Sequence, residues 1–308
     1  MKVLYDHQIF EWQRYGGVSR YFVELLRHFQ AGGPVSAELA LACSCNPYLR
    51  ESGLAPAGVD FTTLPAVAER NRQRSLRHFL PRRKFRGKER LYRVLTALGY
   101  DQPEDIRRHQ QANVRASVSR LQGGAFDVFH PTYYYPYFLP HLGDRPLVVT
   151  IHDMTHELYP EYFDLADGTL AFKRTLAERA TLIIAISEST REDLIRILRV
   201  PGEKVKVVLH GHTRRPSAPA SPAGAPPSLL YVGPRALYKN FCHLPHGALA
   251  LQRQFDRPPL VVLVVLPARL VIVRLNFTHG VAGAALIPTG LFTKLVLVEP
   301  VHPSETVH

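Results

Sequence analysis

Two basic residues four positions apart in one loop are suited to binding a diphosphate. Arg235 and Lys239 follow an apolar run and Gly233, and they precede a segment with the composition of a helix. A guanidinium offers a planar set of donors, an ammonium is a compact charge, and a helix start adds free N–H groups and a favourable dipole. We therefore predict that this loop binds the phosphates of a nucleotide. The alternative is a solvated loop, because exposed basic residues are common.

A glycine pair near the start of the chain is the second candidate. Gly16 and Gly17 follow a predicted strand at residues 2–5 and precede apolar residues at helical spacing, which end at Gly32. Because glycine has no Cβ, a phosphate or a sugar could come close to the backbone at the start of this helix. The alternative is a tight turn that needs positive φ.

His152 is the third candidate. It closes a predicted strand at residues 147–151 and so falls at the carboxyl edge of a parallel sheet, where open α/β proteins bind ligands. A hydrogen-bonded structural histidine is the alternative. Asp153 either orients that imidazole or caps the next segment. His152 and His156 are four positions apart, a spacing that suits two metal ligands on one helix. Pro160 argues against a continuous helix here, so we predict no metal site.

An aromatic run at residues 130–137 follows another predicted strand. Aromatic faces can stack on the apolar faces of sugars, so this run is a candidate platform for an acceptor. Burial of the run beneath the domain is the alternative.

Two serines after a later strand are expected to cap a helix. Ser187 and Ser189 lack the glycine-flanked turn of a hydrolase nucleophile, which disfavours an α/β hydrolase. Ser189 and Glu192 have capping-box spacing, so we expect a helix to begin at Ser189 and to end before Val200.

Short apolar runs alternate with helical patterns along the chain, as is typical of a parallel α/β sheet. Strands are predicted at residues 2–5, 38–43, 59–64, 126–130, 147–151, 182–186 and 205–209. Residues 213–227, rich in proline, alanine and serine, are predicted to link a first domain, residues 1–212, to a second, residues 228–308. A parallel sheet would bring the ends of its strands, including the one before His152, to a single edge.

Five segments, taken in order, resemble family 4 glycosyltransferases. They are residues 5–10, 14–22, 148–154, 185–190 and 231–241. The resemblance implies a GT-B fold, with a Rossmann-like acceptor-side domain first and a donor-binding domain second. It also implies retaining transfer of a sugar from a nucleotide-sugar donor to a glycan or lipid-linked acceptor, without a metal or other cofactor.

The resemblance also implies roles for the candidate residues. Gly16, Gly17, Arg235 and Lys239 would contact the donor. His152 would orient the donor sugar and stabilise charge beside it. These roles agree with the chemistry, because cleavage of a sugar–diphosphate bond produces an anionic leaving group that preorganised positive charge stabilises.

One departure from the family concerns the second domain. Family members carry two glutamates eight positions apart that hold the donor sugar and ribose, whereas the acids after Phe241 are Asp256, Glu299 and Glu305, and position 307 is Val. From about residue 263 the alternation of strands and helices also stops. We expect an incomplete second Rossmann-like domain, a truncated or frame-slipped coding sequence, and a poor or inactive transferase. A non-catalytic remnant that binds nucleotides or carbohydrates is the alternative.

Composition and net charge indicate which kinds of partner this chain would bind. The chain has 308 residues, 46% of them hydrophobic, and a formal net charge of +12, which favours anionic partners. Residues 70–93 hold eleven Arg and Lys among apolar residues, so they are predicted to dock an anionic membrane or acceptor, a solvated insertion being the alternative. A nucleic-acid-binding protein would not need the glycine pair and the basic loop, so we do not expect nucleic acid as a partner.

The expected location is the cytoplasm, with peripheral contact at the inner face of the membrane. Three cysteines give no even disulfide framework, and polar residues interrupt the first apolar run almost at once, unlike a secretory signal. The most apolar run, residues 260–266, is too short to cross a bilayer as a helix.

Overall fold

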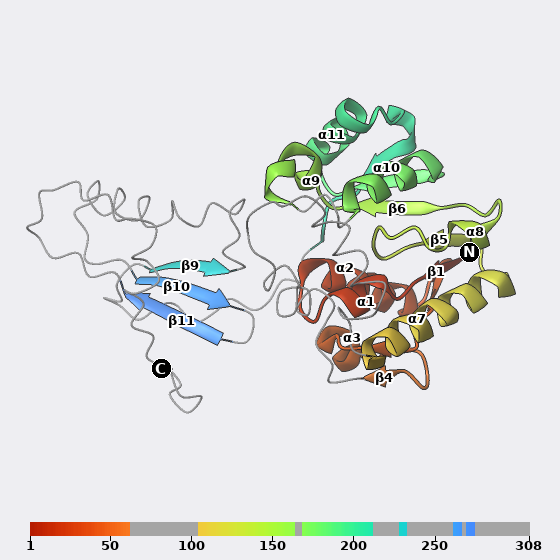
Figure 1. Ribbon diagram of the computed structural model, residues 1–308, viewed down its shortest axis with the longest axis horizontal. Coiled ribbons are helices and arrows are strands. Elements are labelled where there is room, and N and C mark those ends of the chain that lie inside the picture. Colours follow the sequence, from red (N-terminus) through yellow and green to blue (C-terminus); the bar gives the residue numbers. More distant parts are fainter. Residues whose placement is uncertain (62–103, 164–167, 212–227, 233–260, 267–268, 275–308) are drawn as a thin grey trace, which may run out of the picture. The chain divides into compact units, whose positions relative to one another are not determined.

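The structure is a computed structural model that describes residues 1–61, 104–163, 168–211, 228–232, 261–266 and 269–274 (Figure 1). The chain divides into two compact units, Met1–His212 and Thr213–His308. Several predicted features lie outside the described residues. They are the basic stretch at 70–93, the linker at 213–227 and the loop that carries Arg235 and Lys239.

Six parallel strands lie side by side in the described part of the first unit. In spatial order they are β2 (Ser36–Leu39), β1 (Lys2–Tyr5), β5 (Val128–His130), β6 (Val148–Ile151), β7 (Leu182–Ala185) and β8 (Val205–Val207). A single parallel bridge between Phe129 and Leu147 joins the two sets of three strands. This arrangement confirms the predicted parallel α/β sheet.

Helices cover both faces of this sheet. The helices that the structure describes in the first unit are α1 (Gln8–Trp12), α2 (Gly17–Gln30), α3 (Pro47–Ser52), α7 (Glu104–Gly123), α8 (Leu139–Leu142), α9 (Thr155–Leu158), α10 (Thr169–Arg179) and α11 (Glu188–Leu198), with 3-10 turns η1 (Pro160–Tyr162) and η3 (Gly202–Lys204). Successive side chains of a strand point to opposite faces. Tyr5 therefore packs in one core with Phe22 of α2, and Leu4 packs in the other with Leu176 of α10.

The strand predicted at residues 38–43 is wrong as one element, because its run is divided. β2 ends at Leu39, and a separate short strand, β3 (Cys43–Ser44), pairs in parallel with β4 (Asp60–Phe61). The cause is Asn113 of α7, whose Oδ1 accepts from the backbone N–H groups of Ala42 and Cys43 at 3.0 and 2.9 Å. A buried side chain thus replaces a neighbouring strand as the hydrogen-bond partner at this point.

The start of α11 also differs from the prediction. Ser187, rather than Ser189, is the N-cap, since its Oγ accepts from the backbone N–H of Thr190 at 3.1 Å. Ser187 has the extended backbone that an N-cap needs, whereas Ser189 already lies inside the helix. The helix ends at Leu198, before Val200 as predicted, and Arg199 follows with a positive φ of 58°.

The glycine pair begins a helix as predicted, but it does not form a turn with positive φ. Gly16 is the N-cap of α2 with φ of 176°, which is extended backbone, and Gly17 is the first helical residue. An added Cβ at position 16 would overlap the carboxamide of Gln13, which is the flexible end of that side chain and would have to move. The positive-φ alternative is therefore wrong.

The described part of the second unit is a small mixed sheet. Its strands are β9 (Ser228–Val232), β10 (Val261–Leu266) and β11 (Arg269–Arg274), with β10 in the middle. β10 is parallel to β9, as a Rossmann-like domain requires, but antiparallel to β11. Only two residues separate β10 from β11, and a parallel crossover needs about a dozen. The antiparallel pair is a departure from the predicted fold of this domain.

Candidate functional site

Two of the polar residues considered for the site lie at the carboxyl edge of the six-stranded sheet. β1 pairs with β2 on one side and with β5 on the other, so the chain leaves β1 at the point where the strand order reverses. Ligands of open α/β sheets bind outside the carboxyl ends of strands at such a point. Asp6 follows β1 and His152 follows β6, which places both residues at this edge.

His152 lies beneath the first turns of α2. Its ring meets the rings of Tyr21 and Phe22 edge-on, with centroids 5.4 and 6.3 Å away. The ring of His210, which follows β8, lies 6.0 Å away. Within the described residues, the buried Nε2 of His152 has no hydrogen-bond partner. The described residues thus leave the hydrogen-bonding capacity of this nitrogen unused.

The environment keeps the His152 ring neutral at neutral pH. Burial lowers the pKa of His152 to about 4, His210 and Lys173 act in the same direction, and Asp153 opposes them. Burial likewise lowers the pKa of His130 to about 3. A neutral imidazole can offer a ligand one hydrogen bond, and it does not supply a fixed positive charge.

The start of α2 is tied to the end of β6 by Tyr21. This residue is four positions after Gly17, its hydroxyl forms a hydrogen bond with Thr150, and its ring stacks on His210 with centroids 5.0 Å apart. Gln13 Oε1 accepts from the backbone N–H of Ser19 at 3.2 Å. No heavy atom of the described residues lies within 4 Å of a Cβ built on Gly17. His152 therefore lies against Tyr21, about one helical turn after Gly17, and a Cβ on Gly17 would meet open space.

A buried cation next to His152 was not foreseen from the sequence. Lys173 of α10 is 1% exposed, and its Nζ donates to the carbonyl oxygen of Asp153 at 2.9 Å and to Glu157 Oε2 at 3.0 Å. The backbone N–H of His152 donates to the hydroxyl of Tyr134 at 3.2 Å. The ring of Tyr134 in turn lies 5.4 Å from the ammonium.

A second buried carboxylate, Asp6, organises the edge at β1 and β5. Asp6 Oδ1 accepts from the backbone N–H and the hydroxyl of Thr132 at 2.8 and 2.7 Å. Asp6 Oδ2 accepts from Gln8 Nε2 at 2.7 Å and from the Tyr137 hydroxyl at 3.1 Å. Gln8 also accepts from the backbone N–H of Tyr135 at 2.9 Å and donates to its carbonyl at 3.1 Å. The loop after β5 is thereby fixed by neutral donors.

The aromatic run at residues 130–137 contains both buried and exposed rings. Tyr134 is buried in the core. Tyr135 is 54% exposed, stacks on Tyr137 at 5.9 Å and meets Phe172 edge-on at 5.4 Å. An exposed ring on a backbone held by Gln8 is therefore the part of the run that can meet a sugar.

The structure does not bring all of the predicted residues together. Arg235 and Lys239 lie outside the described residues. His152 precedes α9 whereas His156 lies within it, with its ring stacked on Phe163 at 3.9 Å. Searches confined to the described residues find no group of three or more His, Cys, Asp or Glu side chains that could hold a metal ion, and no helix able to cross a membrane.

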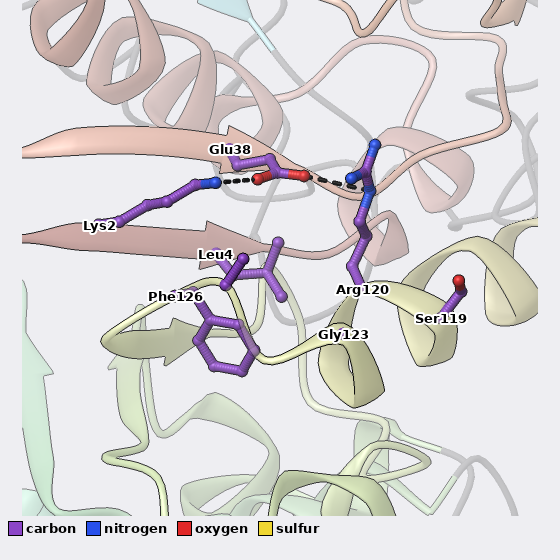
Figure 2. A pocket seen from close by; sticks show the side chains of 8 residues that line it. Lys2, Leu4, Glu38, Ser119, Arg120, Gly123 and Phe126 are labelled. Carbon is purple, nitrogen blue, oxygen red and sulfur yellow. Dashed lines mark ion pairs between the residues drawn. The ribbon is translucent and has the colours of Figure 1, made fainter.

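A pocket of about 330 Å³ lies at the opposite end of β1, beside the last turn of α7 (Figure 2). Lys2 and Arg120 both form ion pairs with Glu38 at its rim, and Leu4 and Phe126 form its apolar wall. None of the predicted site residues lines this pocket. It is therefore separate from the candidate site.

Comparisons with known proteins assign the family. No match is found among curated proteins. Among solved structures, the apo form of lipopolysaccharide outer core galactosyltransferase WaaB is similar at 12% identity and a TM-score of 0.42, covering 87% of this chain and 69% of that one. Residues 15–214, which include the glycine pair, His152 and Lys173, match Glycosyltransferase Family 4. Because that match covers more than half of the sequence, the chain belongs to Glycosyltransferase Family 4.

Proposed function

We propose that this chain transfers a sugar from a nucleotide-sugar donor to a glycan or lipid-linked acceptor, with His152 beside the reacting sugar. The observation that carries the proposal is the neutral, half-buried His152 ring beside Tyr21 of α2, with a buried Nε2 that is unsatisfied among the described residues. Membership of a glycosyltransferase family supports the class of reaction.

The leaving diphosphate is the group that needs stabilisation during transfer. The N-terminus of α2, at Gly16 and Gly17, offers N–H groups and the positive end of a helix dipole, and no acidic residue lies in its first turn. Arg235 and Lys239 would add cationic donors. His152 would donate or accept one hydrogen bond at the sugar, which fixes its orientation as the bond to the phosphate breaks.

The acceptor would bind on the first unit. Tyr135 offers an exposed ring at the same edge of the sheet as His152, and Gln8 fixes its backbone. We propose that this ring stacks on an acceptor sugar. The basic residues 70–93 would hold a lipid-linked acceptor, or the chain itself, at an anionic membrane surface from the cytoplasmic side. Residues 228–308 would supply the donor side.

A non-catalytic protein that binds nucleotide sugars is the second candidate function. It is favoured by the acids after Phe241, which do not include two glutamates eight positions apart. Without groups that orient the donor sugar, a large part of the rate enhancement is lost, because positioning accounts for about 7 to 11 kcal/mol of a barrier. Slow turnover is therefore expected even if the nucleotide binds well.

Turnover and binding measured together separate these functions. The purified chain and His152→Gln would be assayed with a panel of nucleotide sugars and acceptors, and by calorimetry with UDP and GDP. A matched control is His28→Gln, an exposed histidine at the far end of α2. The proposal predicts transfer that falls about 100-fold in His152→Gln and stays unchanged in the control, with nucleotide binding retained. Binding without transfer in all three proteins would favour the second function, and absence of binding would contradict both.

A further inference from the structure

We propose that Lys173, a buried lysine of α10, is the positioning residue that holds His152 at the site, an inference that rests on the proposed function. Its ammonium donates to the carbonyl oxygen of Asp153, the residue immediately after His152, at 2.9 Å. It also pairs with Glu157 of α9 at 3.0 Å. One side chain thus connects a rigid helix to both ends of the segment that begins with His152.

Burial makes this connection stronger than an ordinary surface ion pair. The side chain of Lys173 is 1% exposed and that of Glu157 is 3% exposed. In the described part of the chain, Glu157 Oε1 has no hydrogen-bond partner, so Lys173 is the group that compensates this carboxylate. A cation that served only the fold could be placed at the surface, where it would not need to be desolvated.

His152 is held on both sides by contacts that converge on Lys173. The backbone N–H of His152 donates to the Tyr134 hydroxyl, and the Tyr134 ring lies beneath the ammonium at 5.4 Å. The next carbonyl, that of Asp153, accepts from the ammonium itself. Loss of the ammonium would therefore free the Asp153 carbonyl, one residue after His152, and remove the cation that lies over the Tyr134 ring, whose hydroxyl holds the His152 N–H.

Lys173 also acts on the charge of the ring. The groups that face His152 are Tyr21 from α2, His130 from β5, Tyr134 from the loop after β5, His210 after β8, the adjacent Asp153, and Lys173 from α10. Lys173 and His210 oppose protonation of the ring, and Asp153 favours it. Removal of the cation is therefore expected to raise the pKa of His152.

The test compares Lys173→Met, Lys173→Arg and a control, Lys204→Met. Lys204 donates to the carbonyl oxygens of Ala177 and Glu178, both at 2.8 Å, at the other end of α10. The control therefore removes a similar pair of hydrogen bonds from the same helix without touching His152. Each protein would be labelled at its histidine rings, and the His152 signal, identified by its loss in His152→Gln, would be followed by NMR as pH is lowered.

In Lys173→Met the His152 signal should move and titrate at a higher pH than in the wild type, and Lys173→Arg should restore much of the original behaviour. Donor turnover should fall about 100-fold in kcat with KM changed less than about threefold, because displacement of a reacting group acts on the transition state. Lys204→Met should change neither. An unmoved His152 signal in Lys173→Met would overturn the inference, even if turnover fell. If the wild type transfers no sugar, the proposed function fails while the NMR comparison still decides the role of Lys173.

Discussion

Two buried carboxylates lie at the same edge of one sheet and are compensated in different ways. Asp6 is surrounded by neutral donors from Thr132, Gln8 and Tyr137. In the part of the chain that the structure describes, Glu157 is paired with one buried cation, Lys173. Both arrangements fix loops that follow strands.

The difference lies in how the compensation is distributed. The Asp6 carboxylate shares its charge among several hydrogen bonds, so the loss of one donor leaves the others in place. Among the described residues, the Glu157 carboxylate is paired with one ammonium, so the loss of that ammonium removes the compensation that the described part of the chain supplies. The segment from His152 to Glu157 is therefore expected to be more sensitive to single substitutions than the loop that Asp6 holds.

The largest expected effect is that of Lys173→Met on stability. We expect the free energy of unfolding to fall by about 3 to 5 kcal/mol, because the Glu157 carboxylate would remain buried and unpaired. Urea denaturation followed by circular dichroism measures this change. The double variant with Glu157→Gln should recover part of the loss, and a double variant no more stable than Lys173→Met would show that the pair is not the cause.

Asp6→Asn should cost less, about 2 to 3 kcal/mol. The amide keeps one oxygen for Thr132, but its NH₂ group would face the donors of Gln8 and Tyr137, which lose their acceptor. The same denaturation experiment applies. The control is Asp127→Asn, at the other end of the sheet, whose exposed carboxylate accepts from the backbone N–H of Lys2. If Asp6→Asn destabilised more than Lys173→Met, the contrast between the two carboxylates would be reversed.

Acidification should destabilise the fold through His152. Its pKa is about 4 in the folded chain, below the ordinary value of 6.5, so the unfolded chain binds more protons between these values. Stability is therefore lost as pH falls through this window, by about 2 kcal/mol between about pH 7.5 and pH 5 for this residue. His152→Gln should lose that part of the pH dependence in urea titrations. A variant with the same pH dependence as the wild type would show that the ring is not held neutral.

Nucleotide binding should show the smallest effects. Arg235→Ala is expected to weaken binding of UDP or GDP about tenfold, since a charged hydrogen bond contributes about 1.5 to 3 kcal/mol. Gly17→Ala should weaken it less. The added methyl meets open space in the unbound chain, so the stability of the fold should not change. Thermal-shift titration gives both values, and equal shifts for wild type and Arg235→Ala would remove the loop from the site.

Much of the sheet and part of the site could be predicted from the sequence. Short apolar runs located the strands, and the helical spacing after Gly17 located α2, because burial fixes both periods. The break in the strand at residues 38–43 could not be predicted, since its cause is Asn113, which lies some 70 residues further along the chain. β11 was not predicted, because it pairs directly with β10 and the sequence after residue 263 does not alternate strands with helices.

Lys173 shows why the site was only partly predictable. A signal was present, because Lys173 shares a helical face with Leu176 and Ala177, both of them buried. A lysine at such a position is usually read as a solvated residue at the edge of the face. Its partner Glu157 is 16 positions away, on another helix, and only the fold brings the two together.

The most direct test of the central claim is an NMR titration of the His152 ring with UDP and GDP in the wild-type chain. We expect one nucleotide to shift the His152 signal in a saturable manner, because the proposed donor site lies at the carboxyl edge beside the start of α2. The signal of His28, at the far end of that helix, should stay unchanged. A nucleotide that binds by calorimetry and leaves the His152 signal unmoved would contradict the account, as would the absence of any nucleotide binding.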